Sequence, residues 1–399
     1  MRTVEQVFTS DSPRFRDVRL LGKGANGTAH RIKEIRAGEV ERNYVVKSVE
    51  READVEKLNK EIQLSTNMYG AMHSSQVIVR GGELLAPNSV LEDDPPQRRI
   101  YHITELIQNV SLEEFLEKAV ERQIHTGVPI PNRVLWMIFL CLVRMIMGMA
   151  RPPKTPLNQS PASCRLEVLE KDPAPTDYQI YHGDLEDFNN LIFGDIDLEE
   201  HRLMPILKAI DFGRAVDTNE KTSIVLNGMT APTLTSGNLY HIGRVMQGII
   251  GHRDNPDWRI LFPNLDEDLY TLVQRCVVAD GSKRPSVIEV FNQVNNAVAT
   301  KTGPDSFPGK PNRDGETDFD IQLFVSEVVL SAEYRIAMYS IRAGASYGTF
   351  EPSLYTILEA DVETSAVETS GAENASIAST TSTVDPRLRR RVLRETFAS

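Results

Sequence analysis

The sequence feature that most constrains the fold is an apolar run, VLWMIFLCLV, at residues 134–143. The run ends at Arg144 after ten residues, whereas a helix needs about 20 apolar residues to cross a bilayer. We therefore interpret residues 132–149 as a helix buried in a protein core and expect no membrane association. A chain of 399 residues is long enough to bury such a helix completely.

Composition narrows the class of protein. Hydrophobic residues make up 41% and charged residues 25% of the chain, as in soluble globular proteins. The net charge of -12 argues against nucleic acid as a partner. The three cysteines show no C-x-x-C spacing, so we expect neither a disulfide framework nor a zinc site. With a polar N-terminus, this predicts an intracellular protein, cytoplasmic or nuclear.

The N-terminal part alternates between strand and helix patterns. Residues 17–49 predict strands around a glycine-rich turn, with a second turn at 37–38. Apolar residues at helical spacing predict a helix over 51–66. The strands QVIVRGGEL and RRIYHITELI follow, and Ser111 with Glu114 three residues later predicts the start of another helix.

Later segments change in composition. Residues 151–177 are rich in proline and polar residues and suggest an inserted surface loop. Beyond a domain at 15–300, we expect the following segments: a linker at 301–318, a helical extension at 319–360 and a disordered tail at 361–399.

Gly22, Gly24 and Gly27 form the pattern G-x-G-x-x-G between two predicted strands. Glycine lets backbone N–H groups come close to a phosphate, but an ordinary hairpin turn gives the same pattern. A dinucleotide-binding fingerprint would need a helix directly afterwards, and residues 28–35 continue as a strand instead.

Lys47 ends the apolar strand YVVK. A buried ammonium needs a carboxylate or phosphate partner, and Glu61 on the next helix is the candidate. The alternative is a lysine on an edge strand that faces water.

The stretch YHGDLEDFNNLIF at 181–193 holds His182, Asp184 and Asn189 between a helix and an apolar strand. Further on, Asp211 follows an apolar strand in IDFG. Such residues often form turns and caps. They are equally suited to hold Mg²⁺, which prefers hard oxygen ligands beside phosphates.

Taken in order, the glycine pattern, the strand lysine, the helix glutamate, H-x-D-x-x-x-x-N and D-F-G resemble the signature set of the protein kinase family. The resemblance spans about residues 15–300 and includes LYTLVQRCVVADGSKRPSVIEVF near its end. It implies an α+β, two-lobed protein-kinase-like fold. The β-rich N-lobe would cover residues 15–106 and the mainly helical C-lobe residues 107–300.

The resemblance also implies roles for individual residues. Asp184 would accept the proton of the attacking hydroxyl, and Asn189 and Asp211 would hold magnesium. His182 would be structural and pack under Phe212. The cofactor-binding residues implied for ATP are Gly22, Gly24, Gly27, Lys47, Glu61, Thr104, Glu105 and Leu191.

The sequence departs from the family pattern on the substrate side. Gly183 replaces the usual arginine, and Glu186 stands where Ser/Thr kinases carry a lysine. Thr233 stands where A-P-E has its glutamate, so Arg284 would lose a carboxylate partner. Asn238 replaces the aspartate that braces the catalytic loop.

The resulting expectation is an ATP- and Mg²⁺-dependent protein kinase, divergent and of the Ser/Thr type, that acts on a protein substrate. Two alternatives stay open. One is a pseudokinase that binds ATP and regulates a partner, and the other is a kinase-like phosphotransferase for small molecules.

Overall fold

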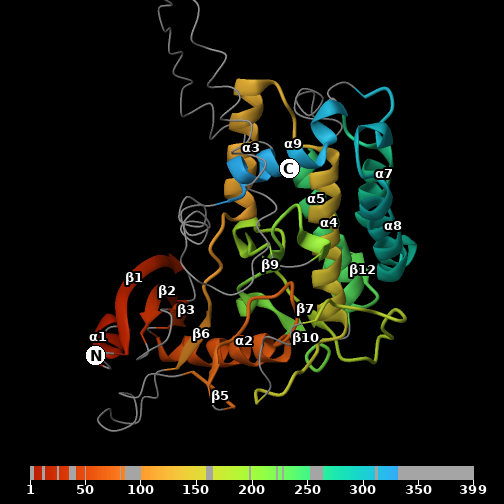
Figure 1. The fold of residues 1–399 in the computed structure, drawn as a ribbon. Helices are drawn as coiled ribbons and strands as arrows, with labels where there is room; N and C mark the ends of the chain where they lie inside the picture. Colours follow the sequence, from red (N-terminus) through yellow and green to blue (C-terminus); the bar gives the residue numbers. More distant parts are fainter. Residues whose placement is uncertain are drawn as a thin grey trace, which may run out of the picture.

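The computed structural model combines an N-terminal antiparallel sheet with a helical C-terminal region (Figure 1). Their spatial separation agrees with the predicted mixed α+β class. The structure describes residues 4–10, 14–24, 27–35, 42–49, 51–80, 82–85, 100–158, 165–196, 199–221, 223–226, 229–251, 264–310 and 313–330.

The N-terminal sheet has the strand order β1-β2-β3-β6, and every neighbouring pair is antiparallel. Buried and more exposed positions alternate along β3 and at the end of β2, and the buried Ile32 and Val46 pack with Phe15 on the helix α1. Alternation of this kind gives a sheet one apolar face. The elements are α1 (Val4–Ser10), β1 (Phe15–Gly24), β2 (Gly27–Glu34), β3 (Arg42–Ser48), η1 (Glu52–Asp54), α2 (Val55–Asn67), β4 (Val79–Arg80), β5 (Glu83–Leu84) and β6 (Tyr101–Glu105).

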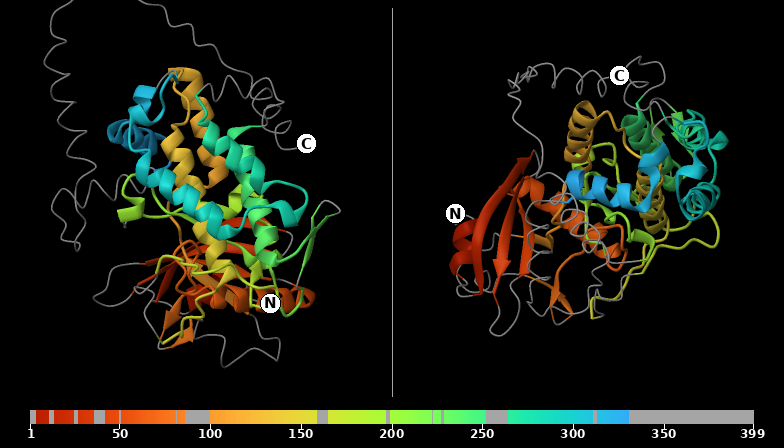
Figure 2. Two further views of the ribbon diagram at one scale, coloured as in Figure 1. Left: turned by 90° about the vertical axis from the view of Figure 1, so that its right-hand side faces the viewer. Right: turned by 45° about the horizontal axis from the view of Figure 1, so that its top comes forward.

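The helical region is built around α4 (Asn132–Ala150), every residue of which is buried. The α5 and α8 helices pack directly against it, as the views in Figures 1 and 2 agree. Among the described residues, α4 is the one helix long and apolar enough to cross a membrane, and its complete burial is that of a core helix. The other helices are α3 (Leu112–Thr126), α5 (Leu234–Ile250), α7 (Glu267–Cys276), α8 (Val287–Thr300) and α9 (Asp318–Val328).

Short antiparallel strand pairs and 3₁₀ turns lie between the longer elements of the helical region. The pair β8–β9 is central, because it leads from one group of candidate site residues to the other. The strands are β7 (Ile180–Tyr181), β8 (Leu191–Phe193), β9 (Leu207–Ala209), β10 (Val216–Asp217), β11 (Ile224–Leu226) and β12 (Met229–Ala231). The 3₁₀ turns are η4 (Phe188–Asn190), η5 (Glu199–His201), η6 (Phe212–Arg214), η7 (Gly281–Lys283), η8 (Pro304–Ser306) and η9 (Arg313–Glu316).

The segment expected as a linker at 301–318 is instead part of the packed helical region. Glu316 is buried and caps the start of α4: its carboxylate accepts hydrogen bonds from the backbone N–H groups of Asn132 and Arg133 at 2.7 and 3.1 Å. These N–H groups have no hydrogen-bond acceptor within the helix, so the carboxylate supplies one. Its negative charge also interacts favourably with the positive end of the helix dipole. The α9 helix continues the packed region to Leu330.

The surface loop expected at 151–177 returns to the core in its second half. Glu167 is buried, and its carbonyl oxygen accepts a hydrogen bond of 2.6 Å from Arg144 of α4. Proline and polar composition signals irregular backbone, but it does not decide whether that backbone is buried.

Other sequence expectations are confirmed within the described residues. The sheet strands form, the helix expected at 51–66 is α2, and the side chain of Ser111 caps α3 by accepting from the Glu114 N–H at 3.2 Å. The turn at 37–38, the tail at 361–399 and residues 331–360 of the helical extension lie outside the described residues.

The contact between α5 and α7 depends on Gly243. A Cβ atom there would lie 2.8 Å from Cβ of Cys276 and 2.9 Å from Val277. We expect Gly243→Ala to lower the free energy of unfolding by about 1–3 kcal/mol, because overpacking outweighs the gain in helix propensity. Urea unfolding would measure the loss. The control, Gly303→Ala, adds a Cβ that meets no atom within 4 Å; equal midpoints for both variants would contradict this packing.

Candidate functional site

Lys47 joins three separate parts of the chain. It lies on β3, and its Nζ is 2.8 Å from a carboxylate oxygen of Glu61 on α2 and 2.8 Å from Oδ1 of Asp211. The Lys47 side chain is 17% exposed and that of Glu61 only 4%, so most of this contact is shielded from water. The expected pair of Lys47 and Glu61 is therefore present, with Asp211 as a second partner.

The charges of this cluster stabilise one another. Burial alone would lower the pKa of Lys47, but the carboxylates of Glu61 and Asp211 outweigh it and hold that pKa above its usual value. For Asp211, burial would raise the pKa, and Lys47 together with the N–H of Gly213 lowers it. One ammonium thus faces the carboxyl groups of two acidic residues, Glu61 and Asp211.

Of three glycine positions near the site, Gly213 lies directly against this cluster. A Cβ at Gly213 would lie 2.9 Å from Oδ1 of Asp211 and 3.4 Å from Nζ of Lys47. By contrast, a Cβ at Gly22 or Gly24 would meet no atom within 4 Å. The packing of the described residues therefore does not require glycine at positions 22 and 24. Glycine at these positions would allow a ligand to come close to the backbone.

His182 and Asn238 fix the backbone ahead of Asp184. The N–H of His182 donates to Oδ1 of Asn238 at 3.1 Å, and the amide of Asn238 donates to the carbonyl of Ile180 at 2.7 Å. Asn238 is fully buried on α5. Asn238 therefore fixes the backbone of this loop to α5. Unlike an aspartate, it also donates a hydrogen bond to a backbone carbonyl group.

His182 is structural, as expected. Its Nε2 donates to the carbonyl of Ile210 at 3.0 Å, and its ring lies 4.9 Å from that of Phe212. Burial lowers the pKa of His182 to about 4, so the imidazole is neutral at physiological pH.

Gly183 has a physical reason to differ from the family pattern. Its φ is +80°, and a Cβ atom would lie 2.6 Å from the carbonyl oxygen of Arg214. A larger side chain would clash with that backbone. Arg214 in turn donates to Oδ1 of Asp184 at 2.7 Å, with its own side chain 66% exposed.

Of the two adjacent asparagines, Asn190 contacts Asp184, whereas Asn189, the residue expected to hold magnesium, does so in no described hydrogen bond. The amide of Asn190 donates to the carbonyl oxygen of Asp184 at 3.0 Å and to its Oδ2 at 3.2 Å. Asn189 turns toward Asp187, whose Oδ1 accepts from both its backbone and side-chain nitrogens. The sequence signal was the second asparagine directly before the apolar strand LIF; counting residues from Asp184 missed it.

Glu186 is turned toward α5. Its carboxylate lies 3.0 Å from Nδ1 of His241 and 4.0 Å from Arg244. Burial would raise the pKa of Glu186, but the contact with His241 and the charge of Arg244 lower it. The extra negative charge that this glutamate brings is therefore partly neutralised.

The remaining expected cofactor residues line the junction between sheet and helices. Thr104 and Glu105 end β6, and Leu191 is fully buried on β8. Glu105 accepts from Lys208 of β9 at 2.8 Å, which fastens the end of the sheet to the helical region.

Gly27 closes the glycine turn with φ +144°, where a Cβ would collide with the Ser48 carbonyl at 2.2 Å.

Arg284 does not need the missing glutamate. Its guanidinium donates to the carbonyls of Val278, Ala279 and Ser236 at 2.7–3.1 Å and lies 4.7 Å from the ring centre of Tyr240. Backbone acceptors and a cation–π contact thus replace an ion pair.

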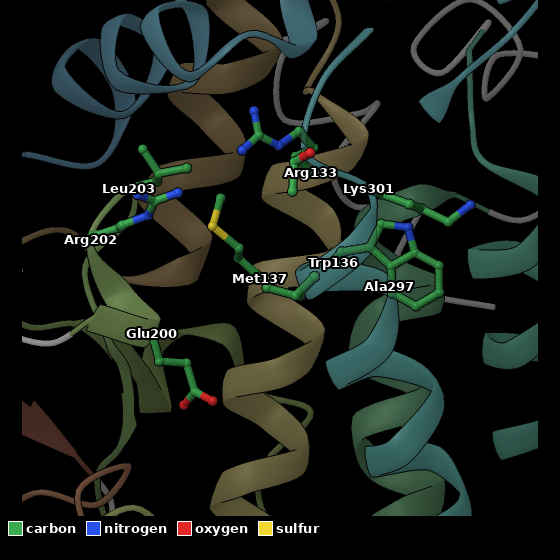
Figure 3. Close-up of a pocket in the computed structure, with 10 residues that line it drawn as sticks. Arg133, Trp136, Met137, Glu200, Arg202, Leu203, Ala297 and Lys301 are labelled. Atoms are coloured by element: carbon green, nitrogen blue, oxygen red, sulfur yellow. The ribbon is translucent and has the colours of Figure 1, made fainter. Parts of the chain in front are cut away.

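A separate cavity of about 120 Å³ lies between α4, α8 and the segment before β9 (Figure 3). Its charged residues are already paired: Arg133 with Asp318 at 2.6 Å and Lys301 with Asp266 at 2.8 Å. Binding sites for drug-sized ligands span about 300–1,000 Å³, so this cavity is too small for a nucleotide.

The sequence matches no protein-family model and no curated protein. The resemblance to protein kinases therefore rests on the sequence motifs alone.

The neutral, buried His182 predicts a pH effect on stability. Its Nδ1 has no hydrogen-bond partner among the described residues, so a proton there would be a buried, unpaired charge. The unfolded imidazole takes up a proton below about pH 6.5 and the folded one only near pH 4. The free energy of unfolding should therefore fall by up to about 3 kcal/mol as pH drops through this window.

We expect His182→Gln to flatten the pH dependence of the thermal midpoint between pH 6.5 and pH 4. The exposed His125, changed to Gln, serves as the control. Parallel curves for wild type and His182→Gln would show that His182 does not carry this effect.

Proposed function

We propose that this chain binds ATP with Mg²⁺ and transfers the γ-phosphoryl group to a hydroxyl of a protein substrate. The observation that carries the proposal is the Lys47 cluster, in which one shielded ammonium is shared by Glu61 and Asp211 at 2.8 Å. Phosphoryl transfer depends on positioning and charge neutralisation more than on covalent chemistry, and this cluster supplies both.

Asp211 and Asn190 fit a magnesium ion by donor chemistry. The hydrogen bonds of Asp211 to Lys47 and Gly213 both use Oδ1, so Oδ2 makes no hydrogen bond within the described part of the chain. The amide nitrogen of Asn190 is engaged with Asp184, which leaves its amide oxygen for a cation. Both are hard oxygen ligands, and a bound Mg²⁺ would neutralise phosphate charge.

Asp184 is the group that would accept the proton of the attacking hydroxyl. The oxygen of that hydroxyl forms the new bond to the γ-phosphorus while the bond to the ADP oxygen breaks. Asn190 orients the carboxylate from one side, and the exposed Arg214 pairs with it from the other. An exposed ion pair of this kind contributes little, about 0–1 kcal/mol, so Arg214 can leave when a substrate binds.

A second candidate function, nucleotide binding without transfer, is favoured by the same contact. In this structure Arg214 occupies Oδ1 of Asp184, and Glu186 replaces a lysine near the transfer site. A pseudokinase would keep this arrangement when nucleotide binds. The hairpin β11–β12 ends at Ala231 and α5 already begins at Leu234. This short connection leaves less surface on which a peptide could bind, so a small-molecule substrate stays the third alternative.

Nucleotide binding is tested by thermal unfolding with ATP, with and without Mg²⁺. Wild type should be stabilised most by both together, and Lys47→Met should lose the shift because a phosphate contact is removed. Asn190→Ala should lose the dependence on Mg²⁺, whereas Asn189→Ala should keep it. Lys60→Met, which removes a surface lysine paired with Glu220, is the control. An unchanged shift in Lys47→Met would overturn the site.

Catalysis is tested with ATP labelled at the γ-position, using the chain itself, generic proteins and a panel of small alcohols as acceptors. Asp184→Asn should lower the initial rate about 10²–10⁴-fold, the usual contribution of a general base. Asp268→Asn, at an exposed position, should not change it. Magnesium-dependent ATP binding without label transfer would establish the pseudokinase, and label on the alcohols alone would establish the small-molecule substrate class.

A further inference from the structure

A buried cluster of titratable side chains lies behind the proposed site. His73 follows α2, Cys141 is in the middle of α4, and His201 ends the turn η5. The exposed fractions of these residues are 0%, 0% and 2%. Their nearest ligand atoms all lie within 4.8 Å of one another.

The orientation of His73 is fixed by a carboxylate. Glu167 accepts from the backbone N–H of His73 at 2.8 Å and lies 2.7 Å from its Nδ1. The other ring nitrogen, Nε2, is buried and has no hydrogen-bond partner among the described residues. A carboxylate on one nitrogen and a free second nitrogen is the usual arrangement of a metal-binding histidine.

His201 repeats this arrangement less tightly. Its Nδ1 is 3.8 Å from Sγ of Cys141, while its Nε2 lies 3.7 Å from a carboxylate oxygen of Glu200. The segment that carries Glu200 runs beside α4 (Figure 3). Zinc–sulfur and zinc–nitrogen distances of about 2.3 and 2.0–2.1 Å at a tetrahedral angle place the two ligand atoms about 3.6 Å apart. The observed separation is therefore close to that of a metal-bound pair.

The charges around the cluster also suit a divalent cation. Arg144 donates to Glu200 at 2.8 Å and is the guanidinium that borders the cluster. Glu167 and Glu200 bring two carboxylates to the cluster and Arg144 brings a guanidinium, so the surroundings can accommodate a divalent cation.

We propose that His73, Cys141 and His201 bind a structural zinc ion. One thiolate and two imidazoles are ligands that zinc prefers, and a water or a small shift of Glu200 can complete four-coordination. The site does not depend on the proposed phosphotransfer. The expectation that the chain has no zinc site came from cysteine spacing, which cannot detect ligands so far apart in the sequence.

The position of the cluster gives the ion a structural role. The carbonyl oxygen of His73 accepts from the N–H of Ala209 on β9 at 2.9 Å, two residues before Asp211. A metal bound here would fix the segment after α2, the helix α4 and the strand that leads to Asp211 relative to one another.

The first test measures metal content in the full chain, purified after expression with added zinc. Wild type and Cys276→Ser should each retain about one zinc ion per chain, and Cys141→Ser and His201→Asn should lose it. Cys276 is the matched control, because it is equally buried and, among the residues that the structure describes, belongs to no such cluster. Zinc retained by Cys141→Ser, or none in wild type, would overturn the proposal.

The second test uses the wild-type fold, so it does not depend on whether the Cys141 variant folds. After removal of metal with a chelator, the thermal midpoint should drop by about 5–10 °C and recover with zinc. Cobalt should then give a near-ultraviolet thiolate-to-metal band in wild type and in Cys276→Ser. Absence of this band, or an unchanged midpoint on chelation, would instead identify the cluster as a hydrogen-bonded group of buried side chains.

Discussion

The rest of the structure depends on the ion pairs that the Lys47 ammonium forms with Glu61 and Asp211. An ammonium shielded from water is costly unless carboxylates surround it, and here they come from two distant segments. Glu61 brings α2 against the sheet, and Asp211 brings in the strand pair β8–β9. The sheet and the helical region are therefore joined at this cluster, as they are also by the pair of Glu105 and Lys208. The carboxylates of the cluster would attract a cation, and that cation together with the Lys47 ammonium would attract phosphates.

A second constraint is the backbone between β7 and β8. Gly183 adopts a left-handed conformation against the backbone of Arg214, and Asn238 holds the preceding residue from α5. These contacts place Asp184 at the end of a tightly bound loop rather than on a mobile one. Two departures from the protein-kinase motifs therefore have local explanations. A side chain at position 183 would clash with the backbone of Arg214, and Asn238 satisfies both an N–H and a carbonyl group.

The sequence predicted what depends on local pattern. The strands, the cap at Ser111 and the pairing of Lys47 with Glu61 follow from alternation, helical spacing and the cost of burying charge. Residue counting selected Asn189 as the metal ligand, whereas the residue that contacts Asp184 is Asn190, and only the loop geometry distinguishes the two adjacent asparagines. Glu316 was missed because a carboxylate that caps a helix about 180 residues earlier leaves no local signal.

The same limit explains why the sequence did not reveal the cluster of His73, Cys141 and His201. The structure also connects this cluster to the site. Both are formed by segments that the strand pair β8–β9 brings together: Asn190 and Asp211 flank one end of the pair, and the loop that carries His201 closes the other. Because the strands are short, with only three residues each, side chains at both ends must hold their register. A metal ion at the closed end would support the position of Asp211 at the open end, so the geometry around Lys47 would depend in part on residues that never contact a nucleotide.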